Sequence, residues 1–134
     1  MPQLVEFTVR SKQQNQWINI SSEVQKAVTA SGIKEGICVV FVPHTTTAIT
    51  INEAADPDVP YDINLALSAI SPDRQDFRHG EGNSAAHTKA SLIGHSITLI
   101  VSVGRLLLGT WQGIWFFEFD GPRTRRVLVK VQGE

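Results

Sequence analysis

Both ends of the chain alternate apolar residues, many of them β-branched, with polar ones, and this pattern constrains the fold more than any other feature. Residues 5–9 alternate strictly, and a second short run follows at residues 17–20. Alternation returns over residues 97–103, and apolar residues recur over residues 113–119 and 127–131. A period of two is typical of a half-buried β-strand. The sequence therefore predicts strands at both ends, antiparallel in the C-terminal third.

The middle of the chain holds two further strands. Residues 37–42 form a continuous apolar run between Gly36 and Pro43, as expected for a buried strand. Residues 45–51 are polar and β-branched and predict a strand directly after it.

Helical periodicity appears first over residues 21–31. Residues 24, 27, 28 and 31 follow the i, i+3, i+4, i+7 spacing of one helix face. Ser21 is a candidate N-cap, and Gly32 can adopt the left-handed conformation that ends a helix. We expect one helix here.

Two more helices are predicted around a long polar loop. A loop rich in Asp and Pro leads into a helix at about residues 63–70. Residues 71–83 have no hydrophobic period, and long loops in small domains are more often functional than idle. Asn83 can cap a helix over residues 84–93 that Gly94 ends. The result is an α+β fold: a single domain over residues 1–134, mostly antiparallel sheet, with about three helices.

Composition excludes several classes of protein. Twelve Lys and Arg against 13 Asp and Glu leave a net charge of −1 in 134 residues, whereas nucleic-acid binders usually carry a basic excess. The apolar runs are too short to cross a membrane, and no basic region with a long apolar run marks a signal peptide. We expect no nucleic acid and no membrane as partners, and a cytoplasmic location. The single cysteine, Cys38, lies in an apolar run and is expected to be buried and inert.

Three histidines are candidates for chemistry. His44 follows an apolar strand, His79 lies in the glycine-containing loop 78–83, and His87 lies in the helix that this loop precedes. Imidazoles can ligate a metal or transfer protons. The alternative is that His79 is a solvated loop residue and His87 a helix-surface residue. His95, at a turn, is expected to be structural and is left out of the site.

Carboxylates cluster within ten residues after the strand at 45–51. Glu53 and Asp56 are candidate ligands of Mg²⁺, which binds one or two carboxylates together with substrate phosphate. Asp58 and Asp62 fit turn and helix-cap roles better.

Cations and an aromatic residue complete the candidate set. Lys89 and Arg105 are residue types that bind phosphate. Lys89 is two residues past His87, so the two side chains point about 200° apart on an ideal helix. Trp111 lies in a glycine-flanked bend at residues 109–113. The bend predicts either a β-bulge with a packing tryptophan or an aromatic platform for a flat heterocycle.

Long strings of the sequence resemble the YjbQ family, in order and over nearly the whole chain. The matching strings are His44–Glu53 (HTTTAITINE), Asp56–Val59 (DPDV), His79–Asn83 (HGEGN), Ala86–Gly94 (AHTKASLIG), Gly104–Gly113 (GRLLLGTWQG) and the closing Arg126–Glu134 (RVLVKVQGE).

The resemblance implies a sheet curved like a half-barrel, a homotrimer, and a weak secondary thiamine-phosphate synthase activity. It also implies histidine-centred sites, with a bound divalent metal, Zn²⁺ or Mg²⁺. The family's polar positions fall here on His44, Asn52, Glu53, Asp56, His79, Asn83, His87, Lys89, Arg105, Thr110, Trp111 and Gln112.

Three hypotheses about function follow. The first is an enzyme acting on a phosphorylated small molecule: His44, His79, His87 and Glu53 would be catalytic. Asn52, Asn83, Lys89, Arg105, Thr110, Trp111 and Gln112 would bind substrate. The second, nested in the first, is a metal site of His44, His79 and His87, with Glu53 and Asp56 as the Mg²⁺ alternative. The third is a metal- or ligand-binding trimer without turnover, which would use its strand edges for assembly.

Overall fold

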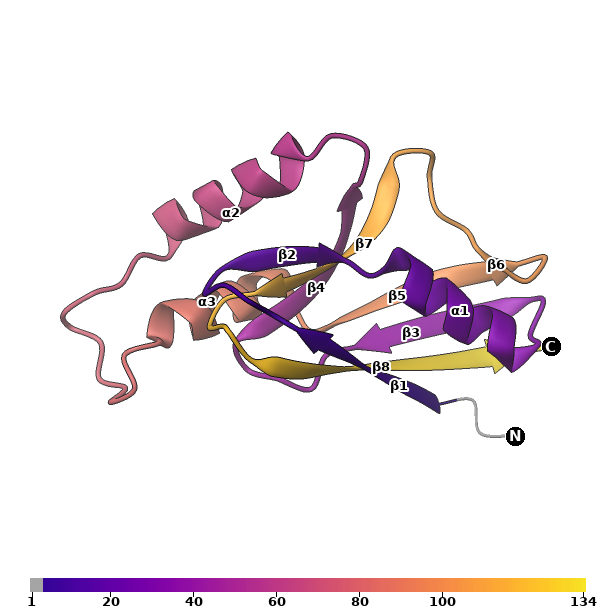
Figure 1. Cartoon of the computed structure of the whole chain (residues 1–134), viewed down its shortest axis with the longest axis horizontal. Coiled ribbons are helices and arrows are strands. Elements are labelled where there is room, and N and C mark those ends of the chain that lie inside the picture. Colours follow the sequence, from indigo (N-terminus) through magenta and orange to yellow (C-terminus); the bar gives the residue numbers. More distant parts are fainter. Residues whose placement is uncertain (1–3) are drawn as a thin grey trace.

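The strands pair antiparallel throughout the computed structural model, which describes residues 4–134. Residues 1–3 lie outside the described residues. They begin the segment in which no signal peptide is predicted. Five strands form one sheet in the order β1-β8-β3-β5-β6 and three form another in the order β2-β7-β4 (Figure 1). Their bounds are β1 Leu4–Arg10, β2 Gln16–Asn19, β3 Gly36–Phe41, β4 Thr47–Glu53, β5 Ser96–Ser102, β6 Arg105–Leu106, β7 Gln112–Glu118 and β8 Thr124–Gly133.

The two sheets form a curled half-barrel, and two of the connections between them lie side by side. β1 runs on into β2, and β7 runs on into β8, so each connection leaves one sheet and enters the other. The two turns are bonded to each other: the Ser11 N–H donates to the Arg123 carbonyl and the Gly121 N–H to the Gln14 carbonyl, both at 3.0 Å. The predicted α+β class with a curved, mostly antiparallel sheet is confirmed.

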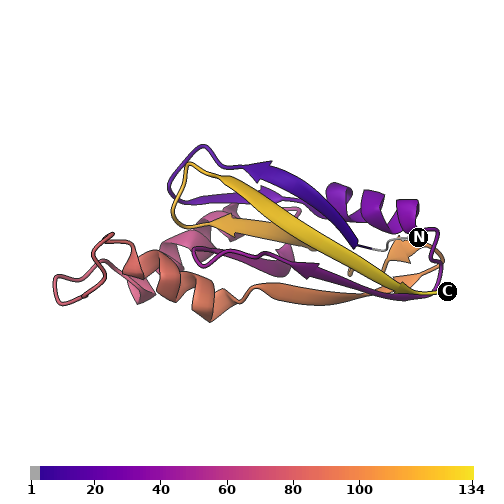
Figure 2. The ribbon, with the colours of Figure 1, turned by 90° about the horizontal axis from the view of Figure 1, so that it is seen from below.

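Three helices cover the two ends of the half-barrel. Helix α1 (Ser21–Ser31) lies at one end, while α2 (Asp58–Ile70) and α3 (Ser84–Ile93) lie together at the other, as Figures 1 and 2 show. Gly32 ends α1 with φ 71°, as predicted. Ser21 is the first helical residue rather than the cap. Its hydroxyl accepts the N–H of Ile114 at 2.8 Å, which ties α1 to β7.

Helix α2 begins earlier than predicted. It starts at Asp58 instead of about residue 63 and contains Pro60. Proline is tolerated in a first helical turn because the N–H there has no partner within the helix. The expectation that Asp62 caps this helix is therefore wrong: Asp62 lies within it.

Strand β7 lies between two hydrophobic cores, which explains its dense apolar sequence. Ile114 and Phe116 belong to the core shared with α1 and the five-stranded sheet. Phe117 and Phe119 belong to the core shared with α2 and α3. Glu118 is fully buried although it is charged, and it lies next to the candidate functional site.

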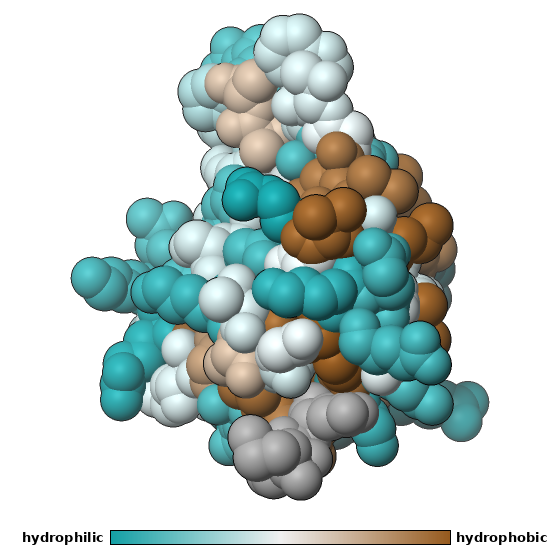
Figure 3. Space-filling view, turned by 90° about the vertical axis from the view of Figure 1, so that its right-hand side faces the viewer, coloured by the Kyte–Doolittle hydropathy of each residue, from teal (hydrophilic) through white to brown (hydrophobic). Residues whose placement is uncertain are grey.

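The end that carries α1 and β6 shows exposed apolar surface. Figure 3 views this end and shows hydrophobic residues gathered on one side of a mostly polar face. Val103, which precedes β6, and Leu107, which follows it, are exposed. A turn was predicted at residues 104–105; the structure forms it one residue earlier, at Val103 (φ 53°) and Gly104 (φ 74°). No helix within residues 4–134 is long and apolar enough to span a membrane.

The lone cysteine lies in the core, as predicted. Cys38 is buried on β3, and burial raises the pKa of its thiol to about 11. A thiol with a raised pKa carries little thiolate and is a poor nucleophile.

Candidate functional site

A polar cavity opens where the start of α3 meets the ends of β7 and β8. We call it the histidine cavity. It has a volume of about 250 Å³. Its lining residues are Thr45, Thr46, His79, Glu81, Asn83, His87, Asp120, Arg123 and Arg125.

Two of the predicted histidines meet at this cavity. The rings of His79 and His87 lie 5.4 Å apart, edge to face at 86°. Nε2 of His79 is 3.8 Å from Oε1 of Glu81. The loop 71–83 folds back on the first turn of α3, which brings His79 close to His87, eight positions later in the sequence. Two imidazoles and a carboxylate at one opening can bind an anion or transfer protons.

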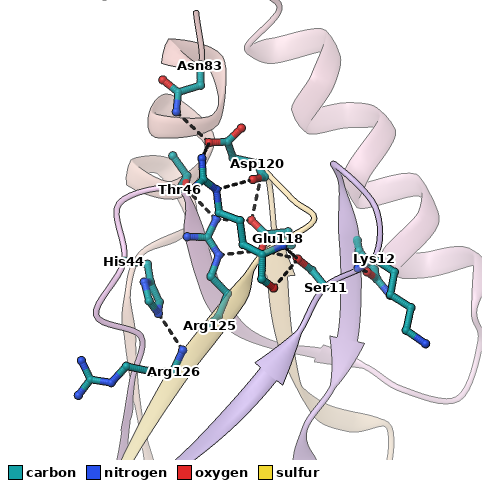
Figure 4. A network of polar contacts seen from close by, with 11 residues as sticks. Ser11, Lys12, His44, Thr46, Asn83, Glu118, Asp120, Arg125 and Arg126 are labelled. Carbon is teal, nitrogen blue, oxygen red and sulfur yellow. Dashed lines mark hydrogen bonds and ion pairs between the residues drawn. The ribbon is translucent and has the colours of Figure 1, made fainter. Parts of the chain in front are cut away.

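A buried ion pair forms the wall behind the histidines (Figure 4). Arg125 donates Nε to Oε1 of Glu118 at 2.8 Å and Nη2 to Oε2 of Glu118. Nη2 also donates to the Thr46 hydroxyl at 2.9 Å. Glu118 and Arg125 are both almost completely buried, so this charge-assisted fork holds the cavity wall in one arrangement.

The Glu118 carboxylate receives two more donors from neighbouring loops. The Ser11 hydroxyl donates to Oε1 at 2.8 Å, and the Asp120 N–H donates to Oε2 at 3.0 Å. The same Ser11 hydroxyl accepts the N–H of Arg123 at 2.9 Å. A buried carboxylate is tolerated only when it is paired and hydrogen-bonded. Glu118 therefore fixes both inter-sheet turns to the cavity wall.

Asn83 holds the rim of the cavity. Its Nδ2 donates to Oδ2 of Asp120 at 2.8 Å, and Arg123 Nη2 lies 3.3 Å from the same oxygen. Asn83 precedes α3 at the predicted cap position, but its side chain makes no hydrogen bond to the helix. The amide instead joins α3 to the turn after β7.

His44 lies outside this cavity and is already bonded. Its Nε2 accepts the backbone N–H of Arg126 at 2.8 Å (Figure 4), which leaves the proton of the neutral ring on Nδ1. Burial lowers the pKa of His44, and the cations Arg125 and Arg126 lower it further against the opposing charge of Glu118. His44 is therefore a neutral imidazole that holds β8.

The three histidines of one chain do not fit a shared metal site. His44 uses Nε2 for a backbone bond, and only His79 and His87 are in ring contact. Within residues 4–134, no group of three His, Cys, Asp or Glu side chains is placed to hold a metal ion. The predicted trio is thus not brought together in one subunit.

Lys89 faces a second, larger cavity on the other side of α3. We call it the lysine cavity; it has a volume of about 480 Å³. It shares Glu81, Asn83 and Asp120 with the histidine cavity. His87 lines one cavity and Lys89 the other, which agrees with the offset of about 200° that two helical positions give.

The remaining candidates lie at the opposite end of the three-stranded sheet. Thr47 pairs with Glu118 at the cavity end of β4, and Glu53 pairs with Gln112 at the other end. These ends are about 20 Å apart at the rise of a β-strand. Asn52 and Asp56 turn their side-chain oxygens to nearby backbone N–H groups, those of Glu53 and Asp58.

The glycine-flanked bend and Arg105 are also remote from both cavities. Gln112 accepts the Gly109 N–H at 2.8 Å, which closes the bend on itself. Thr110 and Trp111 are exposed, and 64% of Trp111 is accessible to solvent. Arg105 lies exposed on β6, at the end of β5 away from His44. These side chains line neither cavity, so their predicted substrate roles stay predictions.

The predicted site omitted Glu118, which lies behind the cavity, and six of the residues that line the cavity: Thr45, Thr46, Glu81, Asp120, Arg123 and Arg125. One signal was available, because Glu118 continues the face of β7 that carries Ile114 and Phe116. A charged residue in register with core residues indicates a buried ion pair. Its partner could not be chosen, because several arginines follow in the sequence.

Comparisons with known proteins agree on one family. The family model described as UPF0047 protein YjbQ-like matches residues 5–134. A UPF0047 protein of Methanocaldococcus jannaschii is 47% identical over 98% of this chain and 95% of its own length. The UPF0047 protein YugU of Bacillus subtilis is 46% identical over 93% of this chain and 96% of its own length.

Solved structures show the same fold. A YjbQ/UPF0047 protein from Clostridium acetobutylicum is 52% identical, covers 96% of this chain and 99% of its own, and gives a TM-score of 0.93. A protein of unknown function from Sulfolobus solfataricus is 34% identical, covers 98% of this chain and 96% of its own, and also gives 0.93. This chain belongs to the YjbQ-like UPF0047 family.

Proposed function

We propose that this protein is an enzyme that binds a small phosphorylated molecule in the histidine cavity and acts on it with His79 and His87. The observation that carries the proposal is the contact of these two imidazoles in a cavity that also holds Arg123 and Arg125. Imidazole and guanidinium groups are the donors that recognise phosphate and stabilise charge on a leaving group.

Charge balance in the cavity supports an anionic ligand whose binding depends on the histidines. Arg125 is paired with the buried Glu118 and Arg123 with Asp120, so the ring N–H groups of His79 and His87 are the donors left for an anionic ligand. Arg125 is held rigidly by Glu118, whereas Arg123 is half exposed and is held by Asp120 at the rim of the cavity.

The specific reaction that we propose is thiamine-phosphate synthesis, as a primary or side activity. A pyrimidinylmethyl diphosphate would couple with a thiazole phosphate and release pyrophosphate, with cations stabilising the leaving diphosphate. In this scheme the lone pair of the thiazole nitrogen forms a bond to the pyrimidinylmethyl carbon as the bond from that carbon to the diphosphate oxygen breaks, and His79 or His87 would give a proton to the departing diphosphate.

A coupling assay with added Mg²⁺ tests this proposal. Product formation should fall at least about a hundredfold in both His79→Ala and His87→Ala proteins, the lower end of the effect of losing a proton-transfer group. His95→Ala is the matched control, because His95 lies past the far end of α3 and lines neither cavity. Full activity in both cavity variants, or equal loss in all three proteins, would contradict the proposal.

Divalent metal binding is a separate proposal. His79 and His87 supply two imidazoles, and a third ligand would have to come from outside this pair. Metal analysis of protein purified without chelator tests it: near-stoichiometric metal that disappears in His79→Ala and His87→Ala supports it, and metal-free wild-type protein contradicts it.

We propose that the protein forms a homotrimer. The alternative function is ligand binding without turnover. The outward face of the larger sheet supports assembly, since Ile37, Phe41 and Ile100 are 44%, 42% and 57% exposed there. Apolar side chains on an open sheet face favour burial against another chain. Light scattering at micromolar concentration tests it; a monomer would contradict it, and Ile100→Lys should weaken the assembly.

A further inference from the structure

Lys89 is the buried lysine of this chain. The other four, Lys12, Lys26, Lys34 and Lys130, are exposed, whereas Lys89 is 6% exposed. Its ammonium nitrogen donates to the Ser68 hydroxyl at 3.2 Å and lies 5.8 Å from the centre of the Phe119 ring. Helix α3 thus directs an amine between α2 and the end of β7, into the wall of the lysine cavity.

No carboxylate of residues 4–134 pairs closely with this amine. Among the described residues, none places a carboxylate oxygen within 4.0 Å of the Lys89 nitrogen. The charged groups that face the cavity are Asp73, Glu81 and Asp120. Burial lowers the pKa of Lys89, and the charge of Asp73 opposes that shift. A desolvated lysine without a close counter-ion is a stronger nucleophile near neutral pH than an exposed one.

The rest of the cavity is built to accept hydrogen bonds. Oδ1 of Asn15 and Oδ1 of Asn83 are buried and have no partner, and both residues line this cavity. The orientation of the Asn83 amide is fixed, because its Nδ2 must face the Asp120 carboxylate. Buried acceptors without partners favour a ligand that carries hydroxyl groups.

Charge in this cavity disfavours the phosphate that Lys89 was predicted to bind. Three carboxylates face one amine, whereas the histidine cavity sets Arg123 and two imidazoles against two carboxylates, with Arg125 paired to the buried Glu118. The lysine cavity therefore suits an uncharged, hydroxyl-bearing molecule that presents an electrophile to the amine.

We propose that Lys89 condenses with a small hydroxylated aldehyde or ketone in the lysine cavity to form an imine. The nitrogen lone pair attacks the carbonyl carbon, and the carbonyl oxygen takes up a proton to give a carbinolamine. The hydroxyl of the carbinolamine then takes up a second proton and leaves as water. The nitrogen lone pair forms the C=N bond as the C–O bond breaks. Ser68, in hydrogen-bond contact with the amine, is placed to relay the proton that the nitrogen loses.

This proposal is independent of the histidine cavity and is tested by reductive trapping. The full-length protein is incubated near neutral pH with dihydroxyacetone and sodium cyanoborohydride, and the modified peptides are mapped by mass spectrometry. We expect one adduct per chain, on Lys89, with little or no adduct on the exposed lysines, because the lowered pKa of Lys89 raises its neutral amine fraction.

Substitutions at Lys89 and at control positions test whether the adduct forms on this amine. Lys89→Met should abolish the adduct, and Lys89→Arg should abolish it while keeping the charge and the packing. Lys130→Met, which removes an exposed lysine, should keep the adduct, and so should His79→Ala, even if the proposed function fails. Adducts spread over the exposed lysines, with Lys89 unmodified, would overturn the proposal. Mapping of the wild-type protein alone detects that result, so the test holds even if the Lys89 variants do not fold.

Discussion

The two ends of the three-stranded sheet carry similar residue types but use them differently. At the Glu118 end, side chains from both sheets, a loop and α3 bond to one another and enclose cavities. At the Glu53 end, Asn52, Asp56 and Gln112 bond to backbone N–H groups within three residues of themselves. Polar residues that organise a site recruit partners from distant segments, whereas local polar contacts mainly shape turns.

The largest expected effect comes from opening the buried ion pair. Arg125→Met leaves the Glu118 carboxylate buried without its main partner, which should cost about 3–5 kcal/mol of unfolding free energy. Adding Glu118→Met should recover part of the loss, because a buried apolar pair replaces a lone charge. Chemical denaturation measures both proteins, and a double variant less stable than Arg125→Met would contradict the ion-pair account.

A packing change should have a smaller effect at the other end of the sheet. An added Cβ at Gly113 would come within 2.6 Å of the Ala54 Cβ, and the Ala54 N–H is held by the Trp111 carbonyl at 2.8 Å. Gly113→Ala should therefore cost about 1–3 kcal/mol, as overpacking does. Gly80→Ala is the control, since nothing lies within 4 Å of its added Cβ. Equal melting temperatures for the two variants would show that this end is loosely packed.

The pH dependence of stability should contain a contribution from His44. The fold lowers the pKa of His44 below its ordinary 6.5, so below that pH the unfolded chain binds a proton that the folded protein excludes. Stability is therefore lost as the pH falls through about 6.5 toward the lowered pKa, and it is retained above. His44→Gln should flatten this part of the profile; an unchanged slope would contradict it.

The smallest effect is expected from Trp111. Its side chain is 64% exposed, and exposed substitutions usually change stability by less than about 0.5 kcal/mol. Trp111→Ala should leave the unfolding free energy, measured by chemical denaturation, nearly unchanged. A loss above about 2 kcal/mol, well outside that range, would show that this tryptophan packs against something beyond its own chain.

Local patterns predicted the elements better than their meeting points. The helix over residues 84–93 and the cap at Gly32 follow from nearby spacing and turn residues, and both are confirmed. The predicted start of helix α2 lies too late in the sequence, because a proline such as Pro60 usually indicates a loop. The first turn of a helix nevertheless accepts proline. Strand β6 is two residues long, too short for any periodicity.

Only the part of the site that neighbouring segments form could be predicted, because sequence patterns report local structure. His79 and His87 are eight residues apart, so one loop and one helix turn suffice to join them. Arg125 reaches Thr46 across 79 positions, and only the crossing of the chain between two sheets brings them together. Chemical type put Glu53 and Trp111 in the predicted site, but it could not show that they lie at the opposite end of the three-stranded sheet from the two cavities.

Calorimetric titration with inorganic pyrophosphate tests the central claim, that the histidine cavity recognises phosphate, most directly. The account predicts binding by the wild-type protein that is lost in both His79→Ala and His87→Ala and kept in His95→Ala and Trp111→Ala. Binding that survives both cavity substitutions but disappears in Trp111→Ala would contradict it and move the site to the other end of the sheet.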